Sequence, residues 1–104
     1  MSEKAEIKRD GARAVSNSGR GQYVKGDSRL DIFTIDYKEY PKGYTVNLDN
    51  WAKICSDAIK NRHSTPAIKI VLGEGQNRTR LWVVGEDIIW DYIRLRQLEE
   101  ANGD

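Results

Sequence analysis

The chain has 104 residues, a length that favours a single domain with one modest hydrophobic core. Hydrophobic residues make up 38% and charged residues 32% of the sequence, which is the balance of a soluble globular protein, and the net charge is +1. No apolar run approaches the 18 residues of a membrane span, and Cys55, the single cysteine, excludes an internal disulfide and a cysteine-rich zinc site. We therefore expect a protein of a reducing cytoplasm without a membrane partner.

The first third of the chain is short in regular elements and rich in basic residues. Residues 3–10 favour a helix that ends before Gly11, and residues 12–16 favour a strand. The segment NSGRGQYVKGDS at 17–28 holds three glycines among basic side chains, so we predict a loop that can face a ligand. Residues 1–29 carry seven Lys and Arg against four acids, whereas residues 87–104 carry two against five. This asymmetry suits a polyanionic partner approached from one side.

The segment LDIFTIDYKEY at 30–40 is the clearest strand of the sequence. Its residues alternate with period two and are rich in β-branched and aromatic types. Asp36 and Lys38 therefore share one face of the strand, together with Thr34 and Tyr40. A turn at residues 41–43 precedes YTVNL at 44–48, which we expect to return as a neighbouring strand.

The second half of the chain predicts a helix, two strands and a final helix. Asn47 or Asp49 can cap a helix over about 49–62. Residues 67–74 and 80–86 read as strands joined by a hairpin-like connection, and a last helix starts at Glu86. The order predicts an α/β fold, a mixed β-sheet flanked by helices. The apolar stripe of the middle helix is expected at Leu48, Trp51, Ala52, Cys55, Ala58 and Ile59.

Two tryptophans are expected in the core, and a third is not. Trp51 lies on the apolar stripe of the middle helix, and Trp82 lies in a predicted strand. The last helix, with Trp90 among several isoleucines and leucines, has more apolar surface than one face can bury against a small body. We interpret that excess as a contact between subunits.

The strand at 30–40 suggests a metal site. Residues i and i+2 of a strand project from the same face about 7 Å apart, so Asp36 and Lys38 lie close together. Asp27 lies upstream, and if the chain folds back its carboxylate can approach Asp36. Two converging carboxylates suit Mg²⁺, which lowers the pKa of bound water and neutralises charge on a phosphodiester. Lys38 could position or deprotonate that water, or stabilise the phosphate. The simpler alternative is a solvated strand face with cross-strand charge partners.

The stretches SGRGQYVKGD, FTIDYKEY, NWAKICSDA and PAIKIVLGE resemble the PD-(D/E)xK nuclease superfamily, particularly its small phage and archaeal Holliday-junction resolvases. The resemblance covers about residues 6–74 and implies a restriction-endonuclease-like core. It also implies that Asp27 and Asp36 hold the metal and that Lys38 completes the catalytic set. The superfamily often adds an acid from its first helix, for which Glu6 is the best match and Glu3 the second choice. Gly26 stands where the superfamily's name has proline, a known variation.

The resemblance further implies Mg²⁺- or Mn²⁺-dependent cleavage of phosphodiester bonds in four-way or otherwise branched DNA. Two matching cuts imply a homodimer with two-fold symmetry. The setting would be the cytoplasm of a bacterial cell, or of the host if a phage encodes the protein. Residues that could grip phosphates, positioning the backbone without reading bases, are Arg13, Ser18, Arg20, Lys25 and Lys53. Two alternatives stay open: a nicking or trimming nuclease of the same superfamily, and a non-catalytic nucleic-acid-binding module.

Overall fold

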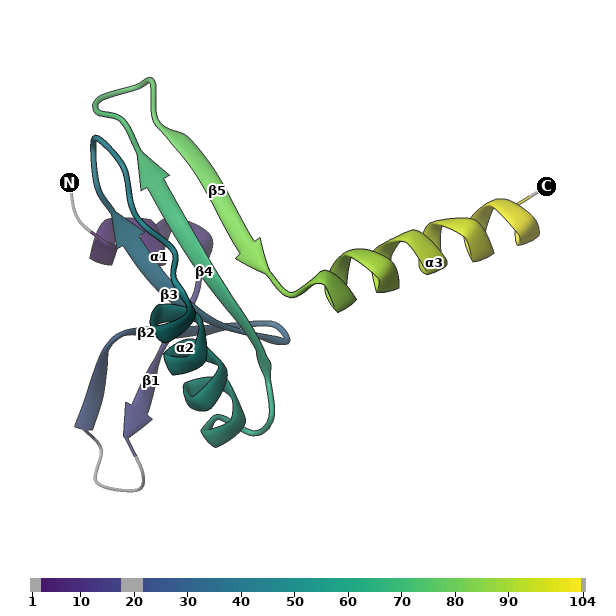
Figure 1. Ribbon diagram of the computed structural model, residues 1–104, viewed down its shortest axis with the longest axis horizontal. Coiled ribbons are helices and arrows are strands. Elements are labelled where there is room, and N and C mark those ends of the chain that lie inside the picture. The colour runs from purple at the N-terminus through teal and green to yellow at the C-terminus, as the bar shows by residue number, and fades with distance from the viewer. Residues whose placement is uncertain (1–2, 18–21, 104) are drawn as a thin grey trace.

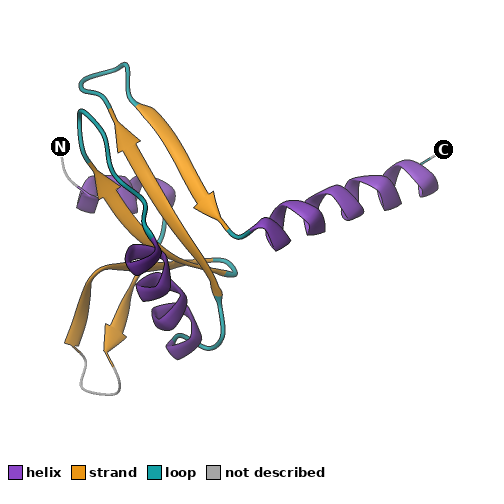
Figure 2. Ribbon diagram, viewed as in Figure 1, coloured by secondary structure: helices purple, strands orange, loops and turns teal. Residues whose placement is uncertain are grey.

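The computed structural model describes residues 3–17 and 22–103, with the backbone alone for residues 14–17 and 22–27. The elements are α1 (Glu3–Asp10), β1 (Arg13–Asn17), β2 (Gln22–Leu30), β3 (Phe33–Glu39), α2 (Leu48–Lys60), β4 (Thr65–Leu72), β5 (Thr79–Val84) and α3 (Glu86–Asn102). The strands described form one sheet in the order β1-β2-β3-β4-β5 (Figure 1). The β3 and β4 strands are parallel and are connected through α2, whereas the other neighbouring pairs are antiparallel. The predicted α/β class with a mixed sheet and packed helices is confirmed (Figure 2).

The two faces of the sheet are covered by different helices. On one face Ile7 of α1 packs against a cluster of Ile35, Tyr37 and Ala67. On the other face, Ile54 of α2 forms a cluster with two isoleucines of β4, Ile68 and Ile70. Because β3 lies between two strands and beneath helices on both sides, its central residues are buried whichever way they point. Polar side chains that alternate along β3 therefore lie inside the protein, where charge interactions are stronger than in water.

The strand predicted over 30–40 is interrupted by a turn. Leu30 ends β2 and pairs with Phe33 at the start of β3, and Asp31 between them adopts a φ of 53°. Aspartate tolerates this left-handed conformation better than most residues, so it suits a tight hairpin. The period-two alternation continues across a turn of two residues, which is why the pattern alone did not reveal it.

Two further predictions about the first half of the chain are corrected. Much of the loop predicted over 17–28 is strand β2, although residues 18–21 lie outside the described residues. The strand predicted at 44–48 is absent from the described structure, where an irregular segment leads from β3 into α2. Asn47 in that segment caps α2, because its side-chain Oδ1 accepts a 2.8 Å hydrogen bond from the backbone N–H of Asn50. The predicted cap is therefore confirmed at Asn47.

The buried side of α2 is rotated from the predicted stripe. Ile54 and Ala58 are the buried residues of this helix, whereas Leu48 is 80% exposed and Ile59 is also exposed. The core contact follows the i, i+3, i+7 series from Trp51, whose partly buried ring packs on the α2-face cluster as expected. Trp82 does not lie in the core, because β5 is an edge strand and leaves this side chain 41% exposed.

The last helix, α3, starts at Glu86 as predicted and has no buried residue. Figure 1 shows it extending away from the sheet. No helix of the part of the chain that the structure describes has the length and apolarity to cross a membrane.

Candidate active site

The pairing of β2 with β3 brings two of the predicted acids to the same place. Asp27 is the direct cross-strand partner of Asp36 in this antiparallel pair. Directly opposite residues share a face of the sheet and have Cβ atoms about 4.5–5.5 Å apart. The side chain of Asp27 lies outside the described part of the structure, so the backbone register is the observation available. That register has the geometry that the predicted two-carboxylate site needs.

Asp36 and Lys38 form an ion pair along the same strand. The Lys38 Nζ lies 3.4 Å from the Asp36 Oδ2, and the two side chains are 27% and 11% exposed. Their partners in β4 are Ile68 and Ile70, which belong to the α2-face cluster. The pair therefore lies at the border of a hydrophobic cluster, with its lysine more open to solvent than its aspartate.

The environment of Asp36 disfavours its charge. Burial raises the pKa of Asp36 above its ordinary value, Lys38 and Lys53 lower it in part, and Glu3 raises it again. The two lysines thus offset only part of the desolvation. A carboxylate in this position would be stabilised by a further positive charge, such as a divalent cation.

The environment of Lys38, by contrast, favours its charged form. Burial alone would lower the pKa of Lys38, but Asp36 and the phenol groups of Tyr44 and Tyr40 outweigh burial and raise it. The ammonium form is therefore favoured at neutral pH. An ammonium can stabilise negative charge on a phosphate, whereas it has no free electron pair with which to accept a proton from water.

Two tyrosines that the sequence analysis did not assign to the site lie beside Lys38. The rings of Tyr40 and Tyr44 stack with centroids 5.2 Å apart, and the Lys38 Nζ lies 5.9 Å from the centroid of the Tyr44 ring. Burial raises the pKa of Tyr44, while Lys38 lowers it and Asp36 raises it. The alternation that places Asp36 and Lys38 on one face also includes Tyr40, so this signal was present in the sequence.

Glu6 lies elsewhere than predicted. It belongs to α1, which covers the opposite face of the sheet, and it is 2% exposed. Its carboxylate lies 2.8 Å from the Nζ of Lys69 and also pairs with Arg80. Burial would raise the pKa of Glu6, but hydrogen bonds from Arg80 and Lys69 lower it to about 2. The assignment of Glu6 to the metal site is therefore corrected: its charge is balanced by Lys69, by Arg80 and, at 3.5 Å, by Arg9.

Glu3, the second choice for the acid of the first helix, is the acid of α1 that interacts electrostatically with Asp36. Its Oε2 accepts a 3.3 Å hydrogen bond from the backbone N–H of Glu39, at the end of β3. Its negative charge contributes to the raised pKa of Asp36. Glu3, at the start of α1, thus reaches the end of β3 near the site, whereas Glu6 in the same turn points to the other face of the sheet, where it pairs with Lys69.

The network around Glu6 was not anticipated from the sequence. Lys69 of β4 is 2% exposed, and its Nζ lies 2.7 Å from the Oδ2 of Asp10 as well as contacting Glu6. The phenol of Tyr37 donates a 2.9 Å hydrogen bond to the same oxygen of Asp10. A lysine within the apolar run AIKIVL was the available signal, because a buried ammonium requires acidic partners.

The residues predicted to contact DNA are placed only in part. Arg13 is exposed on β1, at the edge of the sheet farthest from β5. Lys53 is exposed on α2, lies 3.0 Å from Asp57 and is close enough to lower the pKa of Asp36. Lys25 lies on β2, where the backbone alone is described, and the predicted contacts Ser18 and Arg20 lie outside the described residues. Lys53 is therefore the predicted phosphate contact that the described side chains bring near Asp36.

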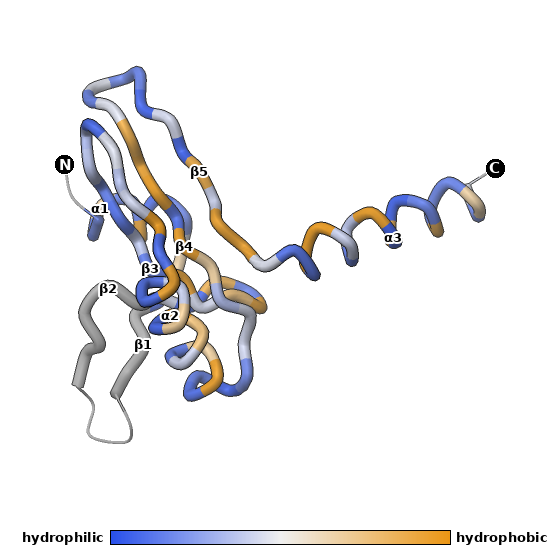
Figure 3. Tube along the Cα trace, viewed as in Figure 1, coloured by the Kyte–Doolittle hydropathy of each residue, from blue (hydrophilic) through white to orange (hydrophobic). Residues whose placement is uncertain are grey.

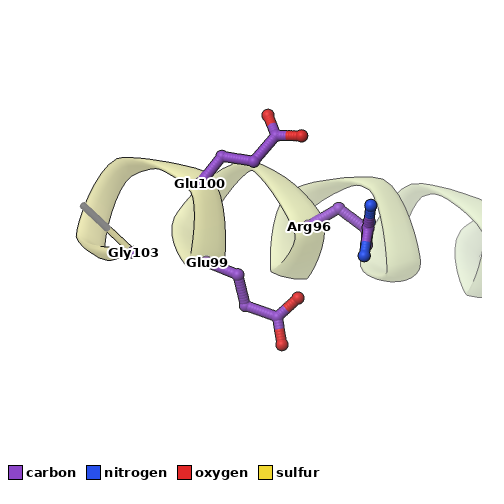
Figure 4. Close-up of a pocket in the computed structure, with 4 residues that line it drawn as sticks. All are labelled: Arg96, Glu99, Glu100 and Gly103. Carbon is purple, nitrogen blue, oxygen red and sulfur yellow. The ribbon is translucent and has the colours of Figure 1, made fainter.

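Of the two acids predicted to hold the metal, Asp36 is the one whose side chain is described, and Glu3 is a described acid that raises its pKa. Among the side chains that the structure describes, no group of three or more His, Cys, Asp or Glu residues could hold a metal ion. The side chain of Asp27, the other acid expected to hold the metal, is not among the described side chains. A hollow near the end of α3, lined by Arg96, Glu99, Glu100 and Gly103, offers no alternative. Figure 4 shows that its two glutamates point to opposite sides of the helix.

The chain was compared with models of protein families, with curated proteins and with solved structures, and none of them matched.

Proposed function

We propose that this protein is a metal-dependent DNA endonuclease of the PD-(D/E)xK superfamily that cleaves phosphodiester bonds in branched DNA. The observation that carries the proposal is the pairing of Asp27 with Asp36 across β2 and β3, with Lys38 3.4 Å from Asp36. A mixed sheet with helices on both faces is compatible with the restriction-endonuclease-like core that the proposal includes.

The donor chemistry fits Mg²⁺ or Mn²⁺. Asp27 and Asp36 would hold the ion, since these metals are bound through one or two carboxylates and fill their remaining positions with water and phosphate oxygens. The raised pKa of Asp36 supports this fit, because a carboxylate that is desolvated gains from a bound cation. When bound, the metal supplies a water of lowered pKa and neutralises charge on the phosphate.

Lys38 and Lys53 supply positive charge beside the two acids. Since its pKa is raised, Lys38 acts as an ammonium and is suited to stabilise the scissile phosphate. Of the roles predicted for Lys38, this one is favoured over deprotonation of water. Lys53 is exposed on α2 and would contact a neighbouring phosphate, with Arg13, Ser18, Arg20 and Lys25 as further contacts of the DNA backbone.

Resolution of a four-way junction requires two cuts, so the proposed enzyme acts as a homodimer with two sites related by a two-fold axis. A relative of the same superfamily that nicks or trims DNA would share the acids and the lysine. Substrate choice separates the two: a resolvase cuts a four-way junction in symmetric pairs and leaves a linear duplex of the same sequence intact.

The decisive experiment is a cleavage assay on a four-way junction with Mg²⁺, with Mn²⁺ and with a chelator. We expect metal-dependent cleavage by the natural chain. Asp36→Asn and Lys38→Ala should each reduce the rate by about 10²-fold or more, the size of losing one electrostatic stabiliser of a transition state. DNA affinity, measured by fluorescence anisotropy without metal, should stay within a few-fold for Asp36→Asn.

Two matched variants control for nonspecific effects. Asp49→Asn and Lys60→Ala make the same chemical changes at exposed positions of α2 and should cleave at the natural rate. The proposal of an enzyme would be overturned if the protein binds DNA but cleaves no DNA with either metal. That result would favour a non-catalytic nucleic-acid-binding module.

A further inference from the structure

The α3 helix lacks the partner that its composition calls for. Trp90, Tyr92 and Leu95 are 49%, 60% and 61% exposed, and none of the residues of the helix is buried. Hydrophobic segments recur along this helix in Figure 3. A helix that is apolar on several sides is normally buried, and the rest of this protomer buries none of the residues of α3.

The body of the protein has an uncovered region of matching character next to α3. The β5 strand forms an edge of the sheet, and the covering helices pack on other strands: α1 on β2 and β3, and α2 on β3 and β4. On β5, Leu81 and Trp82 point to opposite faces and are 44% and 41% exposed. Uncovered apolar side chains on an edge strand are a site at which another chain can add.

The distribution of charge indicates which partner can bind α3. Five of the sixteen acids and two of the seventeen Lys and Arg residues lie on α3, so the helix carries −3 and the remainder of the chain +4. A helix of this charge is repelled by DNA phosphates and by another α3. It is attracted to the body of a second copy of the chain.

We propose that α3 is an exchanged arm: in the homodimer, the α3 helix of each copy packs against β5 and the adjoining sheet of the other copy. The inference builds on the homodimer of the proposed function and names the surface that forms it. The exchange is reciprocal, as a two-fold interface requires. It also covers both apolar surfaces with one contact, which pairing of two α3 helices would not do.

The area is sufficient for a stable dimer. A helix of 17 residues is about 25 Å long and about 10 Å wide, so half of its lateral surface is roughly 400 Å². Two such contacts, each counted on the arm and on the body, bury about 1,600 Å², which is the standard size of a specific interface.

The test measures the mass of the full-length protein in solution by sedimentation over about 1–100 μM, without DNA or metal. We expect a dimer whose dissociation constant rises with salt. The triple variant Ile89→Glu, Trp90→Glu and Leu95→Glu should raise that constant at least 100-fold and keep the strand signal of the circular dichroism spectrum, since α3 contributes no buried residue to the core. Leu48→Glu, a change at an 80% exposed leucine of α2, is the matched control and should stay dimeric.

Leu81→Glu separates exchange from pairing of two α3 helices. It places a negative charge on β5, where the acidic arm would dock, and should weaken the dimer at least 10-fold. An unchanged dimer in this variant, or in the triple variant, would overturn the proposal. So would a natural chain that is monomeric throughout the concentration range. A dimer that does not cleave DNA would support the exchanged arm and refute the nuclease. Cleavage by a monomer would support the nuclease and refute the exchanged arm.

Discussion

Replacing Glu6 with glutamine removes one negative charge from the buried network on the α1 face of the sheet. Lys69, as buried as Glu6 itself, would keep only Asp10 as an acidic partner. Arg80, which reaches the network from the edge strand, would lose a charge-assisted hydrogen bond. The substitution is nearly isosteric, so its effect reports charge and not a cavity.

The magnitude follows from the pKa of Glu6. Its lowering from 4.5 to about 2 corresponds to about 3 kcal/mol of stability, at 1.36 kcal/mol for each pKa unit. Since the pKa is lower in the folded state, this stability is fully present above about pH 4.5 and is lost as the pH falls toward 2. Removing one partner of a buried ion pair costs about 3–5 kcal/mol, which is the same size.

Urea unfolding, followed by tryptophan fluorescence at several pH values between 7 and 2, measures this contribution. At pH 7 we expect Glu6→Gln to be less stable than the natural protein by about 3 kcal/mol, and the difference should shrink as the pH approaches 2. Asp91→Asn disrupts an exposed pair with Arg94 and is the matched control, with a change below about 1 kcal/mol.

Two results would refute this reasoning: equal stability of Glu6→Gln and the natural protein at pH 7, or a difference independent of pH. The same variant tests the function of the residue. If Glu6 stabilises the fold, the variant should keep the proposed metal-dependent cleavage at temperatures where it is folded. Loss of cleavage without loss of stability would instead return Glu6 to the metal site.

Three further substitutions have expected effects on stability that urea unfolding at pH 7 can measure. Asp36→Asn should raise the free energy of unfolding, because burial raises the pKa of Asp36 and so disfavours its ionised form in the folded state. A decrease would show that the ion pair with Lys38 outweighs the cost of burial. Ile54→Ala should lower the free energy of unfolding by about 2–5 kcal/mol, since Ile54 is the centre of the contact between α2 and the sheet, and a loss below 1 kcal/mol would contradict that packing. Asn47→Ala should lower it by about 1 kcal/mol through loss of the bond to the Asn50 N–H, whereas Asn47→Asp should keep that bond and most of the stability.

The sequence was sufficient to place Asp36 and Lys38, because period-two alternation within one strand is a local property. The pairing of Asp27 with Asp36 was foreseen only as a condition, that the chain folds back. The turn at Asp31 that meets this condition left no break in the alternation. Local pattern therefore predicted the face of the strand but not the hairpin.

The position of Glu6 could not be predicted in this way. Which face of the sheet α1 covers depends on packing between Ile7 and the cluster of Ile35 and Tyr37, a contact between distant parts of the chain. The buried Lys69 adds a strong preference, because its ammonium must meet acids, and Glu6 and Asp10 of α1 supply them. Sequence spacing alone treats the acids of the first helix alike, so it could not show that Glu6 pairs with Lys69.

Glu6 and Asp36 are both buried acids, yet their surroundings shift their pKa values in opposite directions. Three cations of the protein, Lys69, Arg80 and Arg9, pair with Glu6, and the first two hold its pKa near 2, so its charge is balanced within the fold. Asp36 has one lysine in contact, a second nearby and a pKa that remains raised, so its charge is balanced incompletely. Acids with perturbed pKa values cluster at functional sites, which makes Asp36 the stronger candidate for binding an external cation. The divergence of the two pKa values thus separates the acid that holds α1 on the sheet from the acid that we assign to the metal.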